Sequence, residues 1–466
     1  MQFGLLLARN LDTQDGLRRA LGAWDTALLT IGSILGTAIF LTPSQIAGAL
    51  PHAGLVLLTW IAGGLLTLAG ALTYAELGAM FPRAGGQYHY LKEAYGSLPA
   101  FLFGWASFFV ILSGGVAAVA SGFGEYFGYF VPFFSNSHRI LSIPLGSASW
   151  TVTGGQLAAA LGIAFFTAVN SFGVRQGATL QNLLTVLTVG SLAVFVGFGL
   201  FGPAPGQPRL FAPRPPGPLL SAFGVALIAV LWAYDGWYNP TFSAGEMREP
   251  GRTLPRGLLA GVAAIVVVYL VTNLVYLRAL TLPALASSPR VGEAAAVALF
   301  GPGVARVVTL AIAVAMFGCL SANVLACSRV YQPMAADGLF FDALARIEPK
   351  HAVPRASLVA QGIWATVLVL SGTFEQLFTY VIFIEVVLFA ATGAAIFVLR
   401  RRRPDVRRPY RAWGYPVVPA FFIAASLGVA VNTLVEKPVE SLAGLGFLAA
   451  GLPAYALWRR KSLRRG

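Results

Sequence analysis

Small residues interrupt the first long apolar run of the chain, where bulkier side chains would form a more stable helix. The run LTIGSILGTAIFLTP (residues 29–43) has four of them near its middle: Gly32, Ser33, Gly36 and Thr37. Glycine destabilises a helix interior by about 1 kcal/mol relative to alanine. If the helix unwinds near 33–38 inside a membrane, the freed backbone groups must line a polar cavity. The half-helix that begins near Thr37 then presents its positive N-terminal end, which suits a carboxylate.

A second apolar run, LIAVLWAYDGWYNPTFSAGE (227–246), is interrupted in a similar way. The residues that break its pattern are Tyr234, Asp235, Gly236, Asn239 and Pro240. An ammonium group would suit the backbone carbonyls around Trp232–Tyr234. It would also suit the carbonyls at the end of the half-helix that precedes the first interruption. Together the two interruptions predict a site for a free amino acid. The alternative is that the small residues only allow close helix packing.

Two carboxylates also fall near the middle of predicted apolar spans, where a charge costs a few kcal/mol or more unless it finds a partner. Asp235 could receive a substrate amine, hold the unwound segment or take up a proton; the alternatives are a structural ion pair or a helix N-cap. Glu385, in TYVIFIEVVLFA, could carry a proton or be a neutral structural group. Glu76 and Glu246 lie near the predicted cytoplasmic ends of their spans, and we interpret them as gate or loop-anchoring groups.

The composition places these residues in a membrane. Of the 466 residues, 57% are hydrophobic and 11% are charged, whereas a soluble protein has about 25% charged residues. Apolar runs of about 20 residues recur, which is the length that crosses roughly 30 Å of hydrocarbon. We therefore expect an all-α integral membrane protein with about twelve spans, near 24–49, 54–80, 98–128, 151–172, 178–202, 219–245, 257–281, 302–334, 355–371, 373–399, 416–433 and 439–458.

Spans 1–5 and 6–10 each take up about 180 residues, and each half opens with an interrupted run. An odd number of spans in each half makes the second half enter the membrane from the opposite side. Paired broken segments in two inverted halves indicate a transporter binding site. The predicted parts are an N-terminal segment (1–22), a first repeat (23–202) and a second repeat (203–400). A basic loop with two further spans (401–458) and a basic tail (459–466) follow.

The positions of Lys and Arg predict the orientation. With the N-terminus in the cytoplasm, 25 of the 32 basic residues face inward, including the cluster RRRRPDVRRPYR (400–411). This positive-inside bias assigns both termini to the cytoplasm and the chain to the cytoplasmic membrane. The net charge of +14 is then explained by the orientation of the chain and by contact of its basic residues with anionic lipid. We therefore expect no nucleic-acid partner. No cleavable signal peptide is visible at the N-terminus.

Intramembrane metal or redox chemistry lacks its usual ligands. The four histidines all fall in predicted loops: His52, His89, His138 and His351. Cys319 and Cys327 lie eight residues apart in one predicted helix, about 12 Å along its axis, too far apart for a disulfide. We therefore expect no enzyme and no cofactor. A channel would need repeated filter loops, which are absent; a substrate sensor that has lost transport stays open.

Five stretches resemble the amino acid–polyamine–organocation (APC) superfamily, and within it the bacterial members of the L-type amino acid transporter branch. GSILGTAIFLTP resembles the family's unwound span 1, and AYDGWYNPTFSAGEMREPGRTLPR (233–256) resembles its broken span 6. The other three are YAELGAMFPRAGGQYHYLKEAYG (74–96), LACSRVYQPMAADGLFFDALARIEPKHAVPRASL (325–358) and LRRRRPDVRRPYRAWGYPVVP (399–419). They cover nearly the whole chain in order.

The resemblance implies a five-plus-five inverted-repeat fold with discontinuous helices 1 and 6, two extra helices, and alternating access. Spans 1, 2, 6 and 7 would rock against spans 3, 4, 8 and 9. The substrate carboxylate would meet the backbone of Gly36, Thr37 and Ala38. Its amine would meet the carbonyls of Ile34, Trp232, Ala233 and Tyr234. The expected pocket walls include Ser113, Asn323 and Phe383.

Two departures from the family pattern bear on substrate size and coupling. Ala38 stands where the family often has glycine, and its methyl group narrows the space beside the substrate α-carbon. Many relatives also have a lysine in span 5 whose ammonium stands in for sodium, whereas QNLLTVLTVG offers Thr188. We expect either sodium binding with oxygens from Thr188 and Ser321, or cation-independent exchange; proton coupling through Asp235 or Glu385 is the third alternative.

The expected function is secondary transport of small or medium neutral L-amino acids, by exchange or by ion-coupled symport, because no strongly charged side-chain receptor is evident. The alternatives are a polyamine or organic-cation carrier and a proton-coupled transporter of cationic amino acids. Animal relatives pair with a single-span glycoprotein through a cysteine between spans 3 and 4. The corresponding loop (131–150) has no cysteine, so we expect no disulfide-linked subunit.

Overall fold

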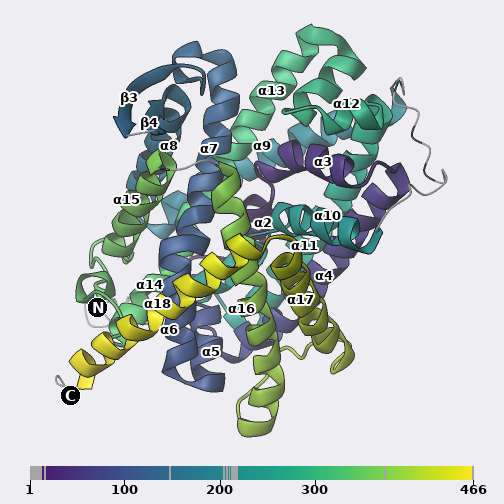
Figure 1. Cartoon of the computed structure of the whole chain (residues 1–466). Helices are drawn as coiled ribbons and strands as arrows, with labels where there is room; N and C mark the ends of the chain where they lie inside the picture. The colour runs from purple at the N-terminus through teal and green to yellow at the C-terminus, as the bar shows by residue number, and fades with distance from the viewer. Residues whose placement is uncertain are drawn as a thin grey trace, which may run out of the picture.

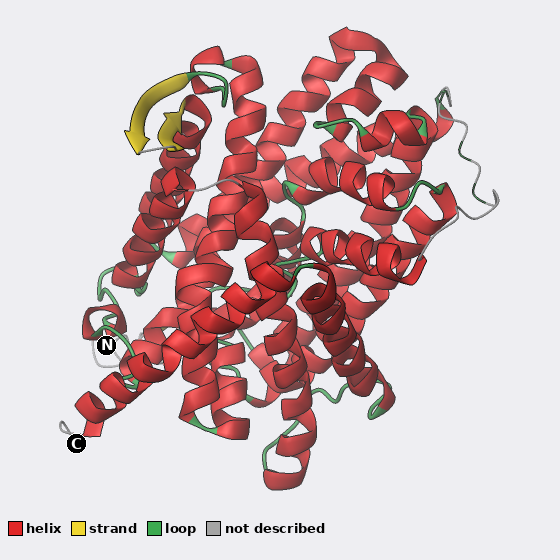
Figure 2. Cartoon of the chain, viewed as in Figure 1, coloured by secondary structure: helices red, strands yellow, loops and turns green. Residues whose placement is uncertain are grey.

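In the computed structural model the chain is almost entirely helical (Figures 1 and 2). The structure describes residues 13–14, 17–145, 148–202, 205, 208, 210, 219–371 and 374–463. The N-terminal residues 1–12, most of the 203–218 connection and the end of the basic tail (464–466) lie outside the described residues. The prediction of an all-α membrane protein is confirmed, with two short β-hairpins added: β1 (Thr13–Gln14) with β2 (Leu17–Arg18), and β3 (Arg139–Leu145) with β4 (Ala148–Thr153).

Within the described part of the chain, eight helical segments are long and apolar enough to cross a membrane, or nine if the bent pair α2 (Ala23–Ile34) and α3 (Ala38–Ala49) is one span. The eight are α4 (Ala53–Met80), α6 to α7 (Ser97–Phe130), α9 (Val174–Phe201), α11 (Pro250–Ala279), α13 to α14 (Val291–Ala336), α16 (Phe374–Arg402), α17 (Val417–Glu436) and α18 (Pro438–Leu463).

Three shorter apolar helices lie where spans 4, 6 and 9 are predicted: α8 (Gly154–Ser171), α10 (Leu219–Ala233) and α15 (Arg355–Ser371). None of the three is longer than 18 residues. The count of twelve spans therefore stays a prediction, as do the inverted repeats at 23–202 and 203–400.

Two span boundaries differ from the prediction for local reasons. Span 4 begins at Gly154 instead of 151, because Thr153 and Gln156 form a reciprocal N-cap in which each side chain accepts a backbone N–H of the other. The segment predicted to begin at 302 starts earlier, at Val291, and is kinked at Gly301, whose φ is 78°. Gly301 adopts this left-handed conformation without the steric cost of a Cβ.

Close helix contacts position the interrupted segments. α2 packs against α11 and α9, and α3 packs against α10. Gly257 and Gly261 lie one turn apart on α11, and a methyl group on either would overlap Thr26 or Thr30 of α2. The small residues therefore let the two backbones approach closely.

The connecting elements gather at opposite ends of the molecule. The β3–β4 hairpin and α12 (Leu282–Ala286) lie at one end, and α5 (Gln87–Tyr95) lies at the other (Figure 1). The sequence predicts the same separation, with 131–150 outside and the segment after span 2 inside. Which end faces the cytoplasm stays a prediction.

Candidate functional site

The first predicted interruption is present. α2 ends at Ile34, α3 begins at Ala38, and the two axes differ by 45°. Leu35 leaves the helical region with a ψ of 83°. Within the described residues, the backbone N–H groups of Gly36 and Thr37 donate to no other group, although Thr37 is only 1% exposed. The start of α3 therefore offers two buried donors that suit a carboxylate.

The second interruption is present and touches the first. α10 ends at Ala233, the chain turns through 234–238, and a 3₁₀ helix, η3 (Asn239–Glu246), follows. Gly236 has a φ of 87°, and a Cβ on it would lie 2.6 Å from the carbonyl oxygen of Ser33. Only glycine allows this backbone contact, so the two breaks form one site.

Asn323 of α13 joins both breaks. Its Nδ2 donates to the carbonyl of Ser33 (3.3 Å), and its Oδ1 accepts from Nδ2 of Asn239 (2.9 Å). The sequence predicts Asn323 as a substrate-binding residue in the pocket wall, and its role as a link between the breaks was not predicted. Of the other expected walls, Ser113 is buried on α7 (Leu112–Phe130), and Phe383 of α16 lies beside Gly444 of α18.

The predicted backbone ligands are all buried in this conformation: Ile34, Gly36, Thr37, Ala38, Trp232, Ala233 and Tyr234. The carbonyl of Ile34, expected to meet the amine, accepts a hydrogen bond from Tyr269 of α11 (2.8 Å). A carbonyl oxygen has two lone pairs, so a second donor can bind it. The carbonyl of Trp232 accepts from the N–H of Asp235 (3.0 Å).

Two residues that contact the site, Cys319 and Tyr269, were not predicted from the sequence. A Cβ on Gly36 would lie 2.8 Å from the Cβ of Cys319, so α13 packs directly on the first break. Cys319 precedes Asn323 by four residues and therefore shares its helix face, which is a usable signal. Tyr269, in the run VVVYLVTNLVY, carries no such signal because aromatic residues are common in membrane helices.

The two predicted intramembrane carboxylates interact with each other. Tyr238 donates its hydroxyl to Glu385, and Asp235 lies within interaction range of both. Oδ1 of Asp235 is buried and has no hydrogen-bond partner in the described part of the chain. Asp235 and Glu385 therefore lie together beside the second break.

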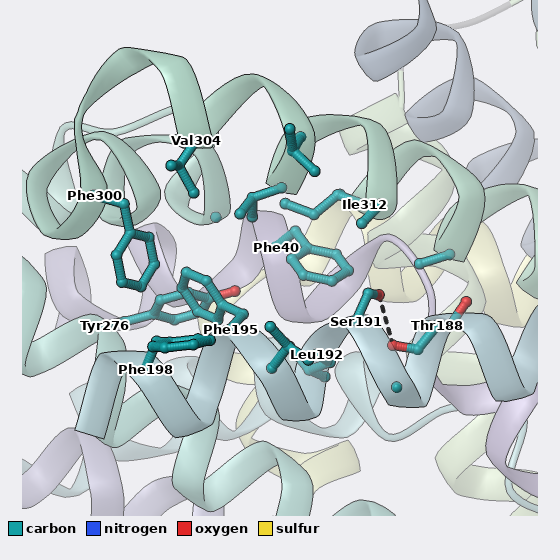
Figure 3. Close-up of a pocket in the computed structure, with 17 residues that line it drawn as sticks. Phe40, Thr188, Ser191, Leu192, Phe195, Phe198, Tyr276, Phe300, Val304 and Ile312 are labelled. Atoms are coloured by element: carbon teal, nitrogen blue, oxygen red, sulfur yellow. Dashed lines mark hydrogen bonds between the residues drawn. The ribbon is translucent and has the colours of Figure 1, made fainter. Parts of the chain in front are cut away.

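The residues expected to bind sodium occupy different surroundings. Thr188 donates its hydroxyl to the carbonyl of Leu184 (2.8 Å) and lines an apolar cavity (Figure 3). Ser321 has a buried hydroxyl without a partner among the described residues. The atoms nearest to a Cβ on Gly32 belong to Gln181, Thr185 and Ala322. The side chains of α9 that pack beside the first break, at Gly32, are therefore Gln181 and Thr185, two turns and one turn before Thr188 respectively.

A profile of amino acid permeases matches residues 21–450. The chain belongs to the amino acid permease family. It is 30% identical to the serine/threonine exchanger SteT of Bacillus subtilis (strain 168) over 451 residues, 96% of this chain and 98% of the relative. It is also 30% identical to b(0,+)-type amino acid transporter 1 of Homo sapiens, over 95% of this chain and 88% of the relative.

Large neutral amino acids transporter small subunit 2 of Homo sapiens is 28% identical to the permease, over 96% of this chain and 82% of the relative. The resemblance to the APC superfamily and its L-type branch is thereby confirmed. The permease is a multi-pass membrane protein and a secondary transporter of amino acids. Among the residues described, no group of three or more His, Cys, Asp or Glu side chains could hold a metal ion.

A buried ion pair joins η3 to η4 (Ser328–Val330), the turn that follows α13. Glu246, the last residue of η3, receives two hydrogen bonds from Arg329 (3.0 and 3.1 Å), and both side chains are 0% exposed. The carbonyl of Glu246 also accepts the N–H groups of Ala20 and Leu21 (2.8 and 2.9 Å). The segment before α2 is therefore fixed to the end of η3. The role of Glu246 as a gate residue stays a prediction.

Glu76, the other carboxylate interpreted as an anchoring group, binds a loop. It receives two hydrogen bonds from Arg400 (2.9 and 2.7 Å) and one from the N–H of Ala412 (2.6 Å). The loop after α16 is thereby attached to α4.

Proposed function

We propose that the permease exchanges small or medium neutral L-amino acids across the cytoplasmic membrane by alternating access. The observation that carries this proposal is the pair of free, buried N–H groups on Gly36 and Thr37, in contact with a second break. A zwitterion matches this arrangement because its carboxylate and its amine need opposite partners. The similarity to a serine/threonine exchanger supports both the exchange mode and the small substrate.

In this proposal the carboxylate binds the N–H groups of Gly36, Thr37 and Ala38. The amine binds the carbonyls of Ile34, Trp232, Ala233 and Tyr234. Hydrogen bonds to charged groups contribute about 1.5–3 kcal/mol each, so a few of them suffice for micromolar to millimolar binding. The neighbouring side chains of Cys319 and Asn323 are uncharged, which favours a neutral substrate side chain.

The test is a transport assay with purified protein in liposomes. Labelled serine, threonine, alanine, leucine, lysine and glutamate are each offered with and without internal unlabelled serine. We expect uptake of serine, threonine and alanine only with internal substrate, and background uptake of lysine and glutamate. Equal uptake into empty liposomes would overturn exchange, and a preference for leucine would overturn the small-substrate assignment.

A second candidate is a proton-coupled carrier of cationic amino acids or other organic cations. It is favoured by the contact between Asp235 and Glu385, which provides two carboxyl groups beside the second break. An imposed inward proton gradient should then drive lysine or polyamine uptake without internal substrate, and Glu385→Gln should abolish that drive. Uptake that ignores the gradient removes this candidate.

Sodium coupling through Ser321 and Thr188 is the remaining coupling proposal. It rests on the buried, unpaired hydroxyl of Ser321, and Thr188 would have to turn its oxygen away from the apolar cavity. Replacing sodium with choline at fixed pH should lower uptake severalfold if sodium couples transport. Unchanged uptake removes it.

We further propose that both termini are cytoplasmic, that 23–202 and 203–400 are inverted repeats, and that no disulfide-linked subunit is required. Both native cysteines are buried, so an added cysteine can be labelled selectively in intact cells. Ser142→Cys in the β3–β4 hairpin should react with a membrane-impermeant maleimide, whereas Arg460→Cys should react only after permeabilisation. The reverse pattern would overturn the orientation.

A further inference from the structure

An apolar cavity of about 470 Å³ lies beside the first half-helix (Figure 3). Its wall combines Phe40 of α3, residues of α9, Tyr276 of α11 and residues of α13. A volume of this size is within the range of small-molecule sites, about 300–1,000 Å³. The proposed transport cycle gives this cavity no role.

The mouth of the cavity faces lipid. Val194 and Phe198 of α9 and Val307 of α13 line it, and they are 59%, 68% and 68% exposed. Both helices are of membrane-spanning length, so apolar side chains exposed on their surface face hydrocarbon. A molecule that enters the cavity therefore comes from the bilayer.

The depth of the cavity corresponds to one leaflet. Its lining on α9 extends from Thr188 to Phe198, a rise of about 15 Å at 1.5 Å per residue. Half of a hydrocarbon core about 30 Å thick is the same length. Tyr276 lies three residues before the end of α11 at Ala279, so its ring belongs to the interfacial end of the cavity.

One polar atom in the wall has no partner. Oη of Tyr276 is buried and makes no hydrogen bond within the described residues. It lies 3.6 Å from the position that a Cβ on Gly292 would take, and Figure 3 shows it among the cavity-lining side chains. An unsatisfied buried hydroxyl costs about 1–3 kcal/mol, which an acceptor on a bound molecule would remove.

We propose that this cavity binds one acyl chain of a membrane phospholipid, with an ester carbonyl of that lipid accepting a hydrogen bond from Tyr276. The chain lies along α9 and ends near Thr188. It contacts Phe40, which is three residues beyond the first break, so the bound lipid supports α3 in its present position. The lipid thereby links the bilayer to the half-helix whose start is the proposed carboxylate site.

The test uses the full chain in nanodiscs that contain phosphatidylcholine with a photoreactive diazirine in one acyl chain. Cross-linked residues are identified by mass spectrometry. We expect cross-links at Leu192 and Ile312, which are only 5% and 3% exposed and which surrounding bulk lipid cannot reach. Cross-links confined to exposed residues such as Phe201 would overturn the proposal.

Two variants with matched controls give independent tests. Ala311→Trp should fill the cavity and lower the buried cross-links at least fivefold, whereas Leu310→Trp, on the exposed side of the same helix, should not. Tyr276→Phe should lower them about fivefold, the equivalent of one net hydrogen bond, and Tyr129→Phe should not. Unchanged cross-links in both test variants, or displacement of the phospholipid by a photoreactive sterol, would overturn the assignment.

Discussion

Glu246→Gln is expected to release the closed end of the permease. Glu246 and Arg329 form a bidentate pair with both side chains 0% exposed. The pair joins η3, in predicted span 6, to η4 (Ser328–Val330) at the end of predicted span 8. If spans 1, 2, 6 and 7 move against 3, 4, 8 and 9, opening must separate these two residues.

The magnitude follows from burial. Removing one partner of a buried ion pair costs about 3–5 kcal/mol, because the other charge stays buried without compensation. In an opened state Arg329 meets water, so the substitution costs little there. The equilibrium constant between the closed and the open state should therefore shift toward the open state by roughly 150- to 5,000-fold, at 1.36 kcal/mol per factor of ten.

A cysteine reporter measures this shift. Leu21 is 2% exposed beside the end of η3, and Leu21→Cys should react slowly with a water-soluble maleimide. Adding Glu246→Gln should raise its rate at least a hundredfold, with mass spectrometry identifying the modified cysteine. Glu93→Gln is the control, because its pair with Arg403 is 30% and 44% exposed and such pairs contribute less than about 1 kcal/mol. A lower melting temperature with an unchanged rate would refute the reasoning.

Three further predictions concern the breaks and helix α5. Asn323→Ala removes the link between the breaks and should raise the KM for exchange at least tenfold. The control is Asn273→Ala, which loses a hydrogen bond within its own helix and should leave the KM unchanged. Equal KM values for the two variants would contradict the prediction. Gly236→Ala forces a Cβ onto the first break at positive φ and should abolish exchange in protein that still purifies. Gly428→Ala on α17, with open space around it, should leave exchange unchanged. Normal exchange by Gly236→Ala would contradict close contact between the breaks. Burial lowers the pKa of His89, although the charge of Asp337 acts to raise it. The unfolded state therefore binds more protons than the folded state below about pH 6.5, and the stability of the protein should fall as the pH drops through that range. His89→Gln should reduce this loss of thermal stability, and the same pH dependence in the variant and the parent protein would contradict the prediction.

The sequence predicts both breaks because their cause is local. Glycine and polar residues inside an apolar run weaken a helix wherever the run folds, so the interruptions at Gly36 and near Asp235 are found where expected. Most helix ends also follow from the length of the apolar runs. The hairpin at 139–153 was not predicted, because it is a short exposed segment with a weak alternating pattern.

The partners of the breaks could not be predicted, because they depend on contacts between distant parts of the chain. Asn323 reaches Ser33 across 290 positions, and Tyr269 reaches Ile34 across 235. The rotation of α9 about its own axis could not be predicted either. The family pattern pointed to Thr188 as the residue near the first break, but the structure has Thr185 next to Gly32.

The most direct measurement is an experimental structure of the permease with a transported amino acid bound. The account predicts the α-carboxylate within hydrogen-bond distance of the N–H groups of Gly36 and Thr37, and the amine against the carbonyls around Trp232. An amino acid bound elsewhere, with both N–H groups still unpaired, would contradict it.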